Sequence, residues 1–345
     1  LIGEIDIVKH AEGRYLSDEA TMHFGLIPRT NRGLFAINEL PDLAPRIQVG
    51  LFNVLEERDV QIRGYPIRLN LDVDPVFSAN PEDYTDRGRI VTPLKDRIGS
   101  VIRTHYPQTT GHAMAISGEN AWLDRRADGT QAGAEARSDE APDQTPDVQI
   151  PSFMHRIVEE AVAMARKSPH INQASGVSVR TSIASLENMV SSAERRGIQT
   201  GEQRVVPRIC DLSHLVASTR GKIELMLADE GDDTEDKLVT SLLGEAVKAV
   251  FDEIADIDEF EYLAEPFEEG LKLQVGDDVS ASDQVASLKH VEGLHEATKD
   301  IAERLNLDAS DDQQLASAGE FLLEALYVHN RLSKHASGEG SSYSR

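Results

Sequence analysis

Two polar residues directly follow an apolar run near the start of the sequence. The run Leu34–Ile37 lies between a glycine and a proline, and Asn38 and Glu39 come next. An apolar run of this length predicts a strand buried on both faces, as in a parallel sheet. Ligands bind at the carboxyl ends of such strands, so Glu39 is placed to polarise an attacking water and residue 38 to help hold a magnesium ion. The alternative is a helix N-cap.

A second apolar run ends in an amide. In VFSANPEDY, the predicted strand Val73–Ser78 is followed by Asn80. An amide beside the first strand tip can hydrogen-bond both a water and a γ-phosphate oxygen, although Asn-Pro is also a common turn. Further along, Arg97 in LKDRIG can present a fixed fork of donors to phosphate oxygens. Taken alone, it would be a surface arginine.

Apolar patterns predict the elements that position these residues. Between the first two strands, Ala44–Glu57 has one apolar face at helical spacing. Two alternating segments within Asp59–Asp72 predict a β-hairpin, and a third strand is predicted at Ser100–Thr104. Short apolar runs that alternate with turn signals indicate an α/β core up to about Pro107.

Helical patterns dominate the rest of the chain. Residues 124–148 contain few large apolar side chains, so they cannot bury enough surface to offset the entropy of ordering them, and we predict a linker or insertion. Apolar residues then recur at helical spacing from Phe153 and again from Leu238, and a last helix is predicted at Gln314–Leu332. The Gly- and Ser-rich tail, residues 336–345, is predicted to be flexible.

Composition limits the function further. The chain of 345 residues is long enough for two or three domains, and it carries 35 Lys and Arg against 60 Asp and Glu, with most of the excess after residue 220. An acidic chain without a basic stripe argues against direct nucleic-acid binding. A single cysteine, Cys210, fits a reducing compartment, and no run of 18 apolar residues occurs. We therefore predict a cytoplasmic protein without a membrane partner.

Four segments together resemble the AAA+ ATPases of the magnesium-chelatase subunit I and MoxR-like clade in order and spacing. They are GLIPRTNRGLFAINELPDL, VGLFNVLEERDVQIRG, SANPEDY and LKDRIG. The resemblance is close over about residues 1–107, looser over 151–196, and does not extend beyond 225. It implies the α/β fold of the C-terminal half of an AAA+ parallel-sheet P-loop ATPase core, followed by an α-helical lid and a further acidic α-helical region.

The resemblance implies a role for each candidate residue. Glu39, at the Walker B end, would be the catalytic carboxylate, and with Asn38 it would contact Mg²⁺-ATP. The family usually has Asp where this chain has Asn38, so the charge at that position is lost. Asn80 would be sensor 1, and Arg97 would be the arginine finger that reaches the neighbouring subunit's nucleotide. Arg180, in SGVSVRTSIASLENM, resembles the sensor 2 arginine that contacts nucleotide, although it could equally solvate a helix start.

The resemblance also implies cofactors, partners and domains. ATP and Mg²⁺ are the expected cofactors. The expected partners are further copies of the chain in a ring, predicted to be a hexamer, and a protein with a von Willebrand factor A-type domain. The domains would be the AAA+ core (1–110), a linker or insertion (111–150), a helical lid (151–225), an acidic helical region (226–335) and a flexible tail (336–345).

One family feature does not occur in the sequence. No G-x-x-x-x-G-K-[ST] phosphate loop is present, and in the family it lies upstream of the region matching Leu1. We therefore expect a fragment that lacks the Walker A part and is inactive by itself. The leading function is ATP hydrolysis in a ring, coupled to remodelling of a partner protein. The alternatives are a magnesium-chelatase ATPase subunit that drives magnesium insertion into protoporphyrin, and a non-hydrolysing AAA+ scaffold, which Asn38 and the absent loop would favour.

Overall fold

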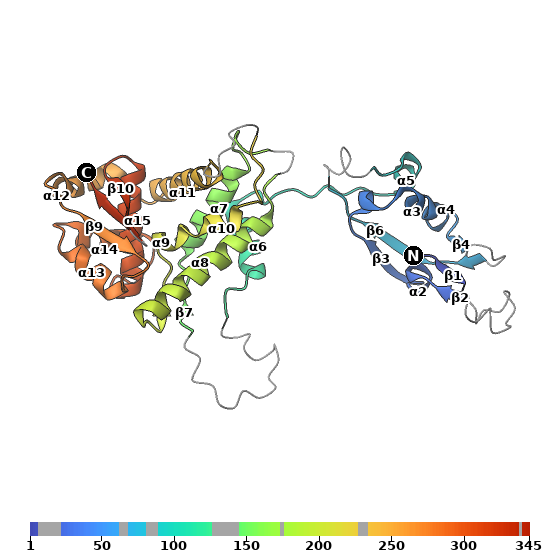
Figure 1. Cartoon of the computed structure of the whole chain (residues 1–345), viewed down its shortest axis with the longest axis horizontal. Helices are drawn as coiled ribbons and strands as arrows, with labels where there is room; N and C mark the ends of the chain where they lie inside the picture. The colour runs from blue at the N-terminus through green and yellow to red at the C-terminus, as the bar shows by residue number, and fades with distance from the viewer. Residues whose placement is uncertain are drawn as a thin grey trace, which may run out of the picture. The chain divides into compact units, whose positions relative to one another are not determined.

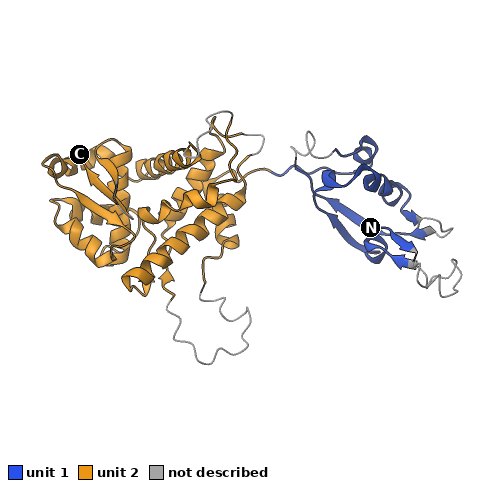
Figure 2. Ribbon diagram, viewed as in Figure 1, with its two compact units in different colours: residues 1–104 blue, residues 105–345 orange. Residues whose placement is uncertain are grey.

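The chain forms two compact units of mixed α/β class, Leu1–Thr104 and His105–Arg345 (Figure 2). The mixed class agrees with the prediction from the sequence. None of the described helices has the length and apolar character that crossing a bilayer requires. The computed structural model describes residues 1–5, 22–61, 68–80, 89–125, 145–172, 176–226, 234–337 and 340–345.

The first unit is built around a two-stranded parallel sheet. Strands β3 (Gly33–Ile37) and β6 (Val73–Phe77) pair in register from Gly33 opposite Val73 to Ile37 opposite Phe77, so their carboxyl ends lie side by side (Figure 1). Both strands predicted to carry candidate residues are therefore confirmed. The prediction that the first is buried on both faces is wrong, because Leu34 is 72% exposed and Ala36 is also exposed in this two-stranded sheet. Ile37 belongs to an apolar core whose other buried members are Ile27, Leu40, Leu51, Val54, Val60, Leu71, Ile90 and Leu94.

Short elements surround this sheet. The predicted helix at 44–57 is two helices, α3 (Pro45–Gly50) and α4 (Phe52–Glu56), which divide beside Gly50, a poor helix former. The predicted hairpin is confirmed as the antiparallel pair of β4 (Asp59–Gln61) and β5 (Arg68–Asn70), and its turn lies outside the described residues. The elements of this unit not yet given are β1 (Gly3–Ile5), β2 (Met22–Phe24), α2 (Leu26–Arg29), the 3-10 helix η2 (Leu40–Asp42) and α5 (Thr92–Asp96).

The predicted strand at Ser100–Thr104 is wrong. This segment forms no β-ladder, and the side chains of Val101 and Ile102 are 77% and 88% exposed. The β-branched residues Val101, Ile102 and Thr104 favour an extended backbone. A strand, however, also needs a neighbouring backbone to accept and donate its hydrogen bonds.

Long helices form most of the second unit (Figure 1). Helix α7 (Ser152–Ala165) buries Phe153, Ile157 and Ala161, which confirms the predicted stripe, and the pattern from Leu238 is helix α11 (Thr234–Asp252). The predicted last helix is α15 (Asp312–Val328). The other helices are α6 (Thr110–Asn120), α8 (Val179–Thr200), α9 (Ile209–Leu212), α10 (Leu215–Thr219), η5 (Ile257–Ala264), α12 (Glu265–Glu268), α13 (Ala281–Lys289) and α14 (Leu294–Arg304).

Two expected domain boundaries do not appear in this unit. The start of the expected linker 111–150 is helix α6, which buries Ala113 and Ser117, while residues 126–144 lie outside the described part of the chain. The lid and the acidic region were expected to be separate. Instead, one apolar core joins residues of α7 and α8 with residues of α11 and α15. Because these helices bury their apolar faces against one another, they form a single folding unit.

The expectation of a flexible tail is wrong. Residues 333–337 form strand β10 (Ser333–Ser337) and residues 340–344 form strand β11 (Gly340–Ser344), and β11 also pairs with β9 (Leu273–Gly276). Tyr343 is fully buried, and its hydroxyl donates to the Glu324 carboxylate. The polar composition of the tail concealed this single aromatic anchor and the backbone pairing around it. The last small sheet of the unit pairs β7 (Asp147–Val148) with β8 (Arg204–Val205).

Candidate functional site

The carboxyl ends of β3 and β6 bring three of the predicted site residues together. Asn38 and Glu39 follow β3 directly, and Asn80 lies three residues beyond the end of β6. Nδ2 of Asn80 lies 3.5 Å from Oε2 of Glu39, which is longer than the usual range of about 2.7–3.2 Å, so this is a weak polar contact. Oδ1 of Asn38 accepts from the hydroxyl of Ser78 at 3.2 Å. The parallel register therefore places a carboxylate and two amides at one edge of the sheet.

Glu39 has an unusual backbone conformation. Its φ of 53° and ψ of 52° lie in the left-handed region, where it precedes the 3-10 helix η2. A non-glycine residue in this region costs on the order of 1–3 kcal/mol, and such residues concentrate at functional sites. Three hydrogen bonds fix the segment, because the Glu39 N–H donates to Ser78 Oγ at 3.2 Å, Leu40 N–H to Ser78 O at 2.9 Å, and Ser78 N–H to Ile37 O at 3.0 Å.

The donor set suits a water-binding site better than a direct metal cage. The side chains at this edge of the sheet are Asn38, Glu39, Ser78 and Asn80, and all four are exposed. Glu39 supplies their single carboxylate. One lone pair of Asn38 Oδ1 is already used by Ser78. Mg²⁺ keeps several waters and takes one or two carboxylates together with substrate phosphates. The residues therefore do not form a metal cage by themselves, and a magnesium ion at this edge would need most of its ligands from other molecules.

Arg97 lies elsewhere in the first unit. It follows α5, and its Nε donates to Oε2 of Glu56 on α4 at 2.7 Å, while its Nη1 donates to the Pro93 carbonyl at 2.8 Å. Its guanidinium carbon is 4.9 Å from the centre of the Phe52 ring. The structure thus joins Arg97 to α4, and its predicted role at a neighbouring subunit's nucleotide stays a prediction.

Arg180 belongs to the second unit. It lies in the first turn of α8, is exposed, and its backbone N–H donates to the Ser178 hydroxyl at 3.2 Å, which caps the helix. This is the helix-start position that the sequence predicted. Its predicted role as a sensor arginine stays a prediction.

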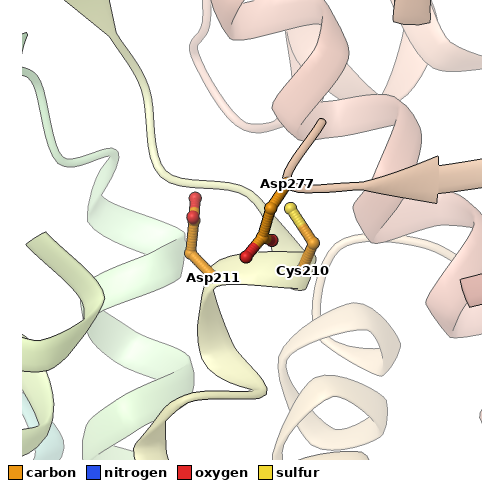
Figure 3. A group of neighbouring side chains, drawn as sticks. All are labelled: Cys210, Asp211 and Asp277. Atoms are coloured by element: carbon orange, nitrogen blue, oxygen red, sulfur yellow. The ribbon is translucent and has the colours of Figure 1, made fainter. Parts of the chain in front are cut away.

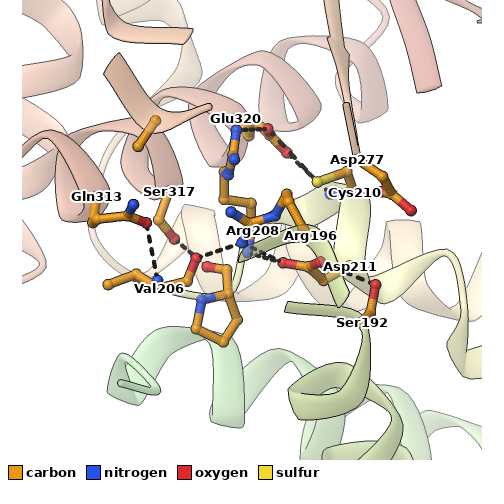
Figure 4. A network of polar contacts seen from close by, with 12 residues as sticks. Ser192, Arg196, Val206, Arg208, Cys210, Asp211, Asp277, Gln313, Ser317 and Glu320 are labelled. Carbon is orange, nitrogen blue, oxygen red and sulfur yellow. Dashed lines mark hydrogen bonds and ion pairs between the residues drawn. The ribbon is translucent and has the colours of Figure 1, made fainter. Parts of the chain in front are cut away.

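A buried ionic network in the second unit was not predicted from the sequence (Figure 4). Arg196 on α8 donates Nη2 to Asp211 Oδ2 at 2.9 Å, and Arg208 approaches Glu320 on α15 with Nη1 and Oε1 3.4 Å apart. Burial raises the pKa of Glu320, and the neighbouring Arg208 opposes that rise. The four charges balance and connect α8, α9 and α15, so the network serves packing. In the sequence, the only indication that Arg208 is buried is its position directly after the apolar run Val205–Pro207.

Part of this network resembles a metal site in its donor types (Figure 3). Cys210, Asp211 and Asp277 offer ligand atoms within 4.8 Å of one another. However, Asp211 accepts from Arg196, and Asp277 Oδ2 accepts from Arg195 Nη2 at 2.5 Å. Burial raises the pKa of the Cys210 thiol well above its usual range, which disfavours the thiolate that binds metals. Arginines already neutralise both carboxylates, so the group does not suit a cation.

A serine, a histidine and a glutamate also meet between α6 and α7. The Ser117 hydroxyl lies 2.9 Å from His155 Nε2 and donates to Glu159 Oε1 at 2.5 Å, and Glu159 Oε2 accepts from Ser182 on α8 at 2.9 Å. In a catalytic triad the carboxylate orients the far nitrogen of the histidine and the serine is accessible. Here the carboxylate contacts the serine itself, and Ser117 is fully buried. The cluster therefore joins three helices and does not form a nucleophile.

Comparisons with known proteins add no family assignment. No family model matches the chain, and a search of curated proteins finds no significant relative.

Proposed function

We propose that the chain contributes the catalytic strand ends of an AAA+ ATPase similar to the magnesium-chelatase subunit I and MoxR-like clade. The observation that carries this proposal is the proximity of Glu39 and Asn80, whose Oε2 and Nδ2 atoms lie 3.5 Å apart at the carboxyl ends of two parallel strands. A carboxylate beside an uncharged amide suits the orientation of a water for attack on a γ-phosphate. Glu39 would polarise that water and Asn80 would position it.

The remaining parts of the mechanism come from the resemblance. Magnesium-bound ATP would supply the reactive phosphate, with Asn38 beside it. Arg97 and Arg180 would contact phosphate oxygens, Arg97 from the adjacent copy of the chain. No phosphate loop occurs within these 345 residues, so hydrolysis would need one from outside them. We expect a cytoplasmic ring, such as a hexamer, that remodels a partner with a von Willebrand factor A-type domain, or that drives magnesium insertion into protoporphyrin as a chelatase subunit.

The test is ATP hydrolysis by protein expressed with its upstream coding sequence. We expect Glu39→Gln to lower the rate at least about a hundredfold while nucleotide binding persists, because a positioned general base contributes about 10²–10⁴. Glu57→Gln, an exposed residue just after α4, is the matched control and should leave the rate unchanged. Equal rates for wild type and Glu39→Gln would refute the assigned site.

One second function has its own support. Asn38 carries no charge where the resembled family has an acid, and Arg97 is ion-paired with Glu56. Both features suit a non-hydrolysing AAA+ scaffold. In that case a form of the protein that includes a phosphate loop would assemble and bind nucleotide. Its wild type, however, would not hydrolyse ATP.

A further inference from the structure

We infer that Ser78 is a positioning residue of the candidate site. Its single hydroxyl orients both Asn38 and Glu39 at the carboxyl end of β3. This inference rests on the proposed function for its consequence in hydrolysis. Its structural part, that Ser78 holds Glu39, can be tested separately.

The backbone of Ser78 is held on both sides. Its N–H donates to Ile37 O at 3.0 Å, and its carbonyl accepts from Leu40 N–H at 2.9 Å. Ser78 thus continues the backbone pairing of β3 and β6 for one residue beyond the last ladder pair, Ile37 with Phe77. The side chain is consequently anchored next to the point where β3 ends.

The hydroxyl of Ser78 makes two compatible hydrogen bonds. It accepts from the Glu39 N–H and donates to Asn38 Oδ1, both at 3.2 Å. A hydroxyl has one donor and two acceptor lone pairs, so both bonds form at once. Alanine at this position would remove both, whereas threonine would keep them and suits a strand end.

Each bond has a consequence for the site. The bond to the Glu39 N–H holds the left-handed turn that follows Asn38, and from this turn the Glu39 carboxylate meets Asn80. The bond to Asn38 orients its oxygen toward Ser78, which leaves the Nδ2 donors for a ligand oxygen.

The structural part is tested on the 345-residue chain by amide hydrogen exchange followed by NMR. In Ser78→Ala we expect exchange at the Glu39 amide to rise about fivefold, the equivalent of about 1 kcal/mol for a lost hydrogen bond. Ser78→Thr should stay near wild type. Ser100→Ala, the matched control at an exposed serine of the same unit, should have no effect at Glu39. Unchanged exchange in Ser78→Ala would overturn the inference.

The functional part uses the protein extended to include a phosphate loop. We expect Ser78→Ala to lower kcat for ATP about tenfold with KM little changed, and Ser78→Thr to restore it, because the hydroxyl acts on the geometry of Glu39. In a Glu39→Gln background, Ser78→Ala should cause no further loss. An equal loss in that background would show that Ser78 does not act through Glu39. If the wild type does not hydrolyse ATP, the proposed function fails, while the exchange experiment still decides whether Ser78 positions Glu39.

Discussion

Arg97, at the end of α5, forms an ion pair with Glu56 on helix α4. Arg97 is the residue that the sequence predicts to act on a neighbouring subunit. The two side chains are 26% and 56% exposed. Exposed ion pairs contribute about 0–1 kcal/mol, because water screens them and both side chains lose freedom. The pair is therefore weak enough for Arg97 to exchange Glu56 for another acidic partner.

This relationship predicts different effects for the two partners. Under the proposed function, Arg97→Ala in the protein extended to include a phosphate loop should lower ATP hydrolysis about a thousandfold or more, as loss of a transition-state arginine does. Glu56→Gln should leave the rate within about twofold, since it removes only a weak resting contact. Arg46→Ala, at an exposed arginine of α3, is the control and should leave the rate unchanged. Similar losses for Arg97→Ala and Arg46→Ala would contradict the assignment.

A second prediction concerns the missing charge at position 38. Asn38→Asp places a second carboxylate at the strand tip, where attraction for a cation is worth about 1 kcal/mol or more at 4 Å. The Mg²⁺ concentration that gives half-maximal ATP hydrolysis should therefore fall about fivefold in the extended protein. Asn53→Asp, the same change at an exposed residue of α4, is the control. A magnesium titration that coincides for Asn38→Asp and wild type would show that residue 38 does not contact the cation shell.

The buried pair of Arg208 and Glu320 predicts a large effect on folding stability. Glu320→Leu leaves a fully buried guanidinium without its carboxylate, so the free energy of unfolding should fall by about 3–5 kcal/mol in urea titrations. The double variant Arg208→Met/Glu320→Leu removes both charges and should recover most of this loss. The exposed pair of Arg220 and Asp236 is the comparison, since Arg220→Ala should cost less than about 1 kcal/mol. Equal losses at both pairs would contradict the burial argument.

His155 predicts a pH dependence of stability. Burial lowers its pKa, while the nearby Glu159 raises it by a smaller amount, so the folded chain binds a proton on His155 less readily than the unfolded chain. Stability from the neutral histidine is then complete above the unfolded pKa of about 6.5 and is lost as pH falls toward the lower folded pKa. One such group adds a slope of at most about 1.4 kcal/mol per pH unit.

The measurement is the free energy of unfolding in urea between pH 7.5 and about 5. His155→Gln can still donate to Ser117 but does not titrate, so its stability should fall less steeply below pH 6.5 than that of the wild type. His112→Gln, at an exposed histidine of α6, should keep the wild-type slope. Parallel curves for wild type and His155→Gln would show that another group carries the acid sensitivity.

Local sequence determined several elements and one part of the candidate site. The predicted strands at Leu34–Ile37 and Val73–Ser78 correspond to β3 and β6, because their Val, Ile and Phe residues favour an extended backbone. Burial on both faces was not realised, since Leu34 and Val76 are exposed. The helical spacing from Leu238 likewise predicted α11. The convergence of Glu39 and Asn80 was predictable once both were placed at the ends of parallel strands.

Tertiary structure decided what local patterns left open. Ser100–Thr104 has a strand-like sequence and no ladder, while the polar tail became β10 and β11, because pairing depends on which backbone lies alongside. A serine after a strand is ordinary in a sequence, and only the register of β3 and β6 placed Ser78 against Glu39. Arg208 and Glu320, which lie 112 residues apart, could be recognised as a buried pair only in the folded chain. Local propensity acts over a few residues, whereas burial and hydrogen bonding between distant groups arise only when the chain has packed.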